Sequence, residues 1–114
     1  LALQFKQRYP TMFRAYQTAC WTKELSTGHL QFYRASDKYI INFPTKNHWR
    51  ENSHLWQIEA GLADFVARYA AYELAAVVWP RLGCGLGGLA WQQVEPLLIR
   101  YLEPLPIMNW ICTI

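Results

Sequence analysis

The sequence lacks any apolar run that approaches the roughly 20 residues needed to span a bilayer, which argues against a membrane-spanning helix. No secretory signal peptide is recognisable either. Cysteine is scarce: Cys20, Cys84 and Cys112 are odd in number and scattered, so they form neither a zinc motif nor a disulfide framework. We therefore expect a reducing, cytoplasmic setting, with no metal site and no membrane partner.

Acidic residues are scarce in the first half of the chain. Residues 1–50 hold eight basic and two acidic side chains, a net charge of +6, whereas residues 51–114 hold three basic and six acidic side chains, a net charge of −3. A basic half suits a polyanionic partner. A solvated basic face would produce the same imbalance.

Glycine is concentrated in one place, because four of the six glycines lie within residues 83–88. The apolar run 75–79 before them, bounded by Pro80, predicts a buried strand. Helical spacing of apolar residues follows from Val94 to Leu102. A strand, a glycine loop and a helix in this order suit a phosphate or pyrophosphate, since the backbone can approach the ligand closely and the helix offers free N–H groups. The alternative is a glycine-rich turn without a ligand.

Two well-known phosphate loops fit this stretch poorly. Gly83, Gly85 and Gly88 satisfy G-x-G-x-x-G, but the next apparent strand, residues 107–114, carries no acidic residue for a ribose. The G-K-[ST] of a Walker loop is absent.

The rest of the pattern predicts an α/β fold. Helices are expected at residues 1–9, from Pro10 or Thr11 through Ala19, and from 55 to 69 with Ser53 as N-cap, while strands are expected at 30–34 and 39–43 as a hairpin. The third helix should show Glu59, Asp64 and Arg68 to water. Helices covering a mixed sheet form the natural architecture, with residues 1–114 as one domain.

Residues 44–53 form a polar loop at the end of the hairpin, and it should face the same cleft as the glycine loop if their strands are neighbours. Lys46 in this loop can pair with phosphate or, with a lowered pKa, act as a nucleophile. A surface lysine is the plain alternative. His48 is either a general acid or base or a polar surface residue, and Trp49 either stacks on a base or covers the sheet edge. Cys84 is read as a small filler of the turn.

Two stretches, residues 39–50 (YIINFPTKNHWR) and 82–91 (LGCGLGGLAW), resemble macro domains, and they look closest to the DarG antitoxin branch, which is related to the terminal ADP-ribose protein glycohydrolases. Residues 2–6 and 58–62 add to the resemblance, which spans nearly the whole chain. It implies a three-layer α/β/α domain that binds ADP-ribose and needs no cofactor. DarG-like members remove ADP-ribose from thymidine in single-stranded DNA and so reverse the action of a DarT toxin.

The resemblance also implies roles for single residues. Lys46, in N-F-P-T-K, matches the family's essential catalytic lysine, and His48, Trp49 and Arg50 would lie by the thymidine or the DNA backbone. The family's diphosphate loop matches a run that would bind ADP-ribose: Gly83, Cys84, Gly85, Leu86, Gly87, Gly88 and Leu89.

The sequence departs from the family pattern twice. The family's early strand and first glycine loop normally precede residues 1–9, so we expect a domain that lacks its N-terminal strand. Protein-directed relatives carry an aspartate where this chain has Gly87, which favours the DNA-directed branch. The alternatives are an ADP-ribose reader without turnover, a hydrolase acting on ADP-ribosylated protein carboxylates, and an inactive remnant.

Overall fold

The computed structural model describes residues 2–22, 25–47 and 50–112. Its elements in chain order are α1 (Ala2–Arg8), α2 (Pro10–Trp21), β1 (Gln31–Ala35), β2 (Lys38–Asn42), α3 (Leu55–Arg68), the 3₁₀ turn η1 (Tyr69–Tyr72), β3 (Ala76–Trp79), α4 (Trp91–Leu102) and β4 (Met108–Ile111). Helices and strands therefore occur where the periodicity predicts them, except that β4 is shorter than the range 107–114 and residues 113 and 114 lie outside the described part.

The strands show both antiparallel and parallel pairing, as the sequence predicts, but they form two separate pairs. β1 and β2 make an antiparallel hairpin in which Gln31 lies opposite Asn42. β3 and β4 are parallel, with Trp79 opposite Ile111, and α4 provides the crossover between them. No hydrogen bond of the described ladders joins β2 to β3, so side-chain packing connects the two pairs.

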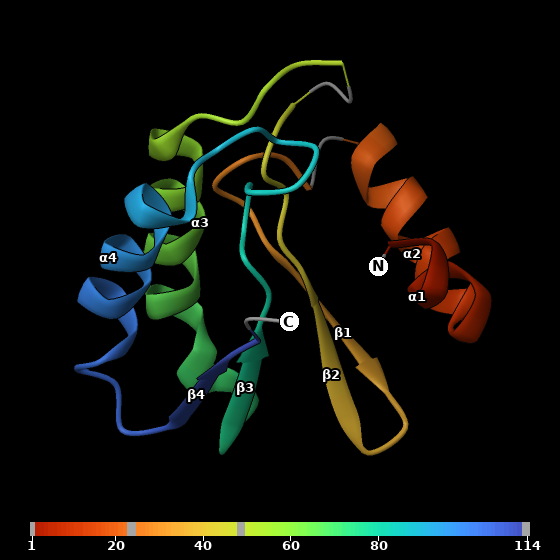
Figure 1. Cartoon of the computed structure of the whole chain (residues 1–114). Coiled ribbons are helices and arrows are strands. Elements are labelled where there is room, and N and C mark those ends of the chain that lie inside the picture. Colours follow the sequence, from red (N-terminus) through yellow and green to blue (C-terminus); the bar gives the residue numbers. More distant parts are fainter. Residues whose placement is uncertain (1, 23–24, 48–49, 113–114) are drawn as a thin grey trace.

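Helices cover the strands from both sides, which confirms the predicted three-layer arrangement (Figure 1). α3 and α4 lie on one side, and their apolar faces bury Ile58, Leu62, Phe65, Val94 and Leu98 completely. α1 and α2 lie on the other side, where Met12 of α2 packs with residues of the hairpin in a second, smaller cluster. The amphipathic patterns of these helices are thus explained by burial of one face of each.

α3 packs very closely on the end of the hairpin. A Cβ atom on Gly61 would collide with the ring of Phe43, the residue that follows β2. Phe43 in turn meets the indole of Trp79 edge-to-face, with ring centroids 6.2 Å apart. The glycine in the middle of α3 therefore serves close packing, which offsets its low helix propensity.

Two predictions about α3 are wrong. Its N-cap is His54, whose backbone N–H donates to Oε1 of Gln57 at 2.9 Å, whereas Ser53 is buried with its side chain packed against the glycine loop. The second error concerns Asp64 and Arg68. Their side chains are only 17% and 38% exposed, and they pair with each other at 2.8 Å instead of facing water separately.

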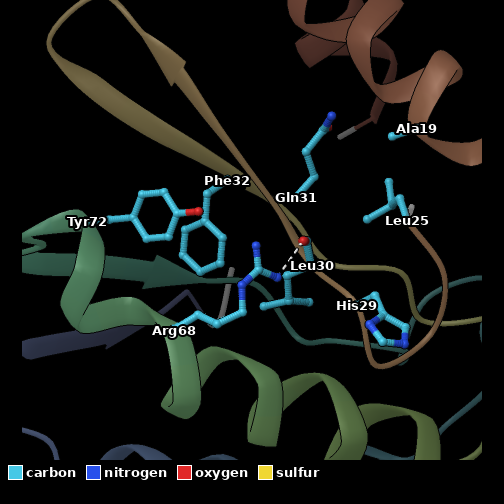
Figure 2. A pocket seen from close by; sticks show the side chains of 8 residues that line it. All are labelled: Ala19, Leu25, His29, Leu30, Gln31, Phe32, Arg68 and Tyr72. Atoms are coloured by element: carbon cyan, nitrogen blue, oxygen red, sulfur yellow. Dashed lines mark hydrogen bonds between the residues drawn. The ribbon is translucent and has the colours of Figure 1, made fainter. Parts of the chain in front are cut away.

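The Asp64–Arg68 pair holds the start of the edge strand β1. The backbone N–H of Leu30 donates to Oδ2 of Asp64 at 2.9 Å. Nη1 of Arg68 donates to the carbonyl oxygen of Leu30, also at 2.9 Å (Figure 2). The pair thus satisfies both backbone groups of a residue that is 3% exposed.

We expect Asp64→Ala to lower the free energy of unfolding by about 1–3 kcal/mol, because it leaves the buried Leu30 N–H without an acceptor and Arg68 without its carboxylate. Glu59→Ala on the same helix is the matched control. Glu59 pairs with the exposed Arg100 at a long 3.7 Å, so its loss should cost about 0.5 kcal/mol or less. Urea denaturation followed by tryptophan fluorescence measures both, and equal losses would contradict the prediction.

Candidate functional site

The glycine loop connects β3 to α4 and is held by its own backbone. Leu89 N–H donates to the Gly83 carbonyl at 2.9 Å, and Gly88 N–H donates to the Gly85 carbonyl at 3.1 Å. Gly83 and Gly88 have φ values of +74° and +80°, which an L side chain rarely adopts. At these two positions the loop needs glycine for its conformation.

The outer part of the loop leaves backbone donors unused. None of the described hydrogen bonds involves the N–H of Gly85, Leu86 or Gly87. The Leu86 side chain is 95% exposed at the tip. α4 begins just after the loop, and no side chain caps its N-terminus. Consecutive free N–H groups beside a helix N-terminus form an environment that attracts an anion.

The lysine loop, residues 43–53, follows β2 and is anchored near its start. The Thr27 hydroxyl donates to Oδ1 of Asn47 at 3.1 Å, which ties the segment before β1 to the residue after Lys46. Lys46 itself is half-buried, and within the described part of the chain no hydrogen bond or ion pair engages its ammonium group. Arg50 is exposed. His48 and Trp49 lie outside the described residues.

The two loops meet through a backbone hydrogen bond and a side-chain contact. Ser53 N–H donates to the Gly87 carbonyl at 2.9 Å, and the Asn52 side chain lies beside Gly88. In Figure 1 both loops occupy the same end of the molecule, above the strands. The contact therefore brings the end of the lysine loop directly onto the glycine loop, although β2 and β3 are not hydrogen-bonded neighbours.

The junction of the loops is so tight that Gly87 has no room for a side chain. A Cβ atom there would lie 2.5 Å from the Gly83 carbonyl oxygen and 2.5 Å from Oγ of Ser53. Gly85, in contrast, would place a Cβ in open space. Gly87 thus serves the packing of the two loops, and Gly85 faces outward.

Cys84 behaves as the sequence suggests, as a half-buried part of the turn. Its thiol donates to the Leu82 carbonyl with a sulfur-to-oxygen distance of 3.5 Å. Burial raises the pKa of the Cys84 thiol, and the positive charge of Arg81 opposes this only in part. A raised pKa disfavours the thiolate, so Cys84 is poorly suited to act as a nucleophile.

Two hollows lie elsewhere on the molecule. The one in Figure 2 has a volume of about 260 Å³ and is lined by residues from the end of α2, the start of β1 and the end of α3, including His29, Gln31 and Arg68. The other, of about 360 Å³, lies between α4 and β4. Neither hollow is lined by a residue of the glycine loop or by Lys46.

Other kinds of site find no support in the described ranges. In residues 2–22, 25–47 and 50–112 no three His, Cys, Asp or Glu side chains gather where they could hold a metal ion. Across the same residues no helix has both the length and the apolar character to cross a membrane.

Sequence reasoning missed the residues that anchor the lysine loop and those that join it to the glycine loop. Ser53 was assigned to helix capping, and Asn47 and Asn52 were given no role. Nothing in a single sequence distinguishes these polar loop residues from solvated ones, because their partners lie 20 to 36 positions away in the chain.

Comparison with known proteins places this geometry in a family. The sequence matches the Macro domain family over residues 1–98. It is 44% identical over 110 residues to the DNA ADP-ribosyl glycohydrolase of Mycobacterium tuberculosis, an alignment that covers 93% of this chain and 31% of the relative. The chain thus spans about a third of the length of the curated relatives it matches.

Solved structures agree with the sequence match. The macrodomain of Mycobacterium tuberculosis DarG superposes with a TM-score of 0.92 at 43% identity, covering 96% of this chain and 76% of that one. Thermosipho africanus DarTG in complex with ADP-ribose gives a TM-score of 0.91 at 36% identity, covering 97% of this chain and 33% of that one. Because the family match extends over most of the sequence and the folds coincide, the chain belongs to the macro domain family.

Proposed function

We propose that this chain is the catalytic macro domain of a DNA ADP-ribosyl glycohydrolase, which binds ADP-ribose and removes it from thymidine in single-stranded DNA. The observation that carries the proposal is the junction of the two loops. It sets a lysine loop against a glycine loop whose outer N–H groups make no hydrogen bond to any residue that the structure describes. Relatives named DNA ADP-ribosyl glycohydrolase and a DarTG structure in complex with ADP-ribose support this choice of ligand and reaction.

The diphosphate of ADP-ribose would rest on the glycine loop. The N–H groups of Gly85, Leu86 and Gly87 can donate to its oxygens, and the N-terminus of α4 adds a favourable field. The remaining residues of the proposed binding run supply the shape of the loop: Gly83, Cys84, Gly88 and Leu89. No cofactor enters this scheme.

Lys46 would act at the anomeric carbon of the distal ribose. In one form its neutral amine attacks that carbon while the bond to thymine breaks, and the bonding electron pair and the amine proton go to the base. The ribose ring of the adduct then opens to an imine with Lys46, which water hydrolyses to release ADP-ribose. In the other form its ammonium group stabilises the charge that develops as the bond breaks. Trapping with borohydride distinguishes them, because only the first form passes through a reducible Lys46 adduct.

The DNA would reach the site along the lysine loop. His48, Trp49 and Arg50 follow Lys46 in sequence, and the first 50 residues carry a net charge of +6, which favours a polyanion. The proposal also includes a DarT-like toxin as the source of the modified DNA, and a cytoplasmic location. The name DarTG of the Thermosipho relative supports the toxin.

Two other functions use the same loops. A reader without turnover would need the glycine loop but not Lys46. A hydrolase for protein carboxylates that carries an aspartate at this position of the glycine loop would need a side chain at Gly87. The Gly83 carbonyl leaves no space for one. The steric observation favours the DNA-directed reaction over this rival.

We expect Lys46→Ala to lower the rate of ADP-ribose release from a thymidine-ADP-ribosylated single-stranded oligonucleotide by roughly 100-fold or more, because it removes the reacting group. Lys38→Ala, an exposed lysine of the hairpin, is the control and should keep full activity. Unchanged release by Lys46→Ala would reject the catalytic role. The wild-type chain could bind ADP-ribose but release none from the oligonucleotide, while the Mycobacterium tuberculosis DarG macrodomain releases it in the same assay. That result would identify the chain as a reader.

We expect Gly85→Ala to weaken ADP-ribose binding by roughly tenfold, since the new methyl group would stand between the loop and the diphosphate. The melting temperature should stay within about 1 °C of the wild type, because the methyl group meets nothing in the free protein. Calorimetric titration with ADP-ribose and thermal denaturation measure the two effects. Normal affinity in this variant would mean that the diphosphate does not rest on this part of the loop.

A further inference from the structure

Ser53 joins the two loops through its backbone but leaves its hydroxyl group unused. The residue is 4% exposed, and its N–H donates to the Gly87 carbonyl. Its Oγ atom is fully buried and has no hydrogen-bond partner within the described part of the chain. A buried hydroxyl without a partner is unfavourable, and native proteins rarely retain one without a reason.

An acceptor for this hydroxyl lies close by. Oγ of Ser53 and the carbonyl oxygen of Gly83 are each 2.5 Å from the position of a Cβ on Gly87, so they are at most about 5 Å apart. The Gly83 carbonyl accepts one hydrogen bond, from Leu89 N–H, and a carbonyl can accept two. A shift of the loop by one or two ångströms would complete a Ser53–Gly83 hydrogen bond.

The outer part of the glycine loop carries the donors through which a ligand would shift it. Its outer donors at Gly85, Leu86 and Gly87 are free to follow a ligand, and Gly83 already adopts a left-handed conformation that few other residues allow. A diphosphate that draws these donors toward itself would move the backbone of Gly87, whose Cβ position lies 2.5 Å from both Oγ of Ser53 and the Gly83 carbonyl oxygen.

We propose that Ser53 is a positioning residue whose hydroxyl donates to the Gly83 carbonyl only when a diphosphate occupies the glycine loop. The hydrogen bond ties Ser53 to Gly83 as well as to Gly87 while the ligand is bound. This inference rests on the proposed binding of ADP-ribose.

Ser53→Ala isolates the hydroxyl, because alanine keeps the backbone donor to Gly87. We expect it to weaken binding of ADP-ribose roughly threefold to tenfold, the effect of one neutral hydrogen bond. The melting temperature should stay equal or rise, since the variant removes an unpaired buried group from the free protein. ADP, which carries the diphosphate without the distal ribose, should show the same loss, whereas adenosine should show none.

Calorimetry with the three ligands and thermal denaturation of the same chain test the proposal. Thr18→Ala is the control: its hydroxyl bonds the Arg14 carbonyl within α2, away from both loops, so ligand affinity should not change. Unchanged affinity in Ser53→Ala, or a loss accompanied by a clear fall in melting temperature, would overturn the inference while the function stands. Failure of the wild-type chain to bind ADP-ribose would instead overturn the proposed function and this inference together.

Discussion

The position of the Trp79 side chain determines how the rest of the structure fits together. Its indole N–H donates to Asn109 of β4 at 2.9 Å, its ring meets Phe65 of α3 edge-to-face at 4.8 Å, and it also packs on Phe43 after β2. One residue thus connects both strand pairs with the central helix. Trp79 also ends the strand that leads into the glycine loop, and Phe43 precedes Lys46 by three residues, so this packing sets the origin of both loops.

The loops themselves are joined by backbone groups rather than by large side chains. Ser53 donates to Gly87, and the close contact is possible because Gly87 carries no Cβ. Because backbone groups form this junction, little side-chain entropy is lost when the two loops meet. Few side-chain contacts must break when the outer part of the glycine loop moves. It therefore combines a rigid base, fixed by the aromatic core, with an outer segment that can adjust to a ligand.

The sequence predicts the parts of this structure that depend on local pattern. Helices and strands follow from apolar spacing, and the glycine loop follows from its own composition. The features that it could not predict depend on distant partners: Ser53 faces Gly87, 34 residues later, and the Asp64–Arg68 pair binds Leu30, 34 to 38 residues earlier. The separation of the strands into two pairs is likewise a property of the assembled chain, since the sequence of each strand is compatible with either arrangement. Only the resemblance favoured a catalytic role for Lys46. From the sequence alone, a lysine in a polar loop can equally be a phosphate-binding, a nucleophilic or an ordinary surface residue.

Steric exclusion at Gly87 also limits the chemistry that the site can perform. A carboxylate at position 87 would need a side chain there, and any side chain would displace the Gly83 carbonyl and Ser53. Those groups hold the loop in the form that leaves its outer N–H donors free. If the proposed function holds, the same packing excludes a carboxylate at position 87 from the reaction, and bond cleavage would depend on Lys46 and on the electrostatic environment of the bound ligand.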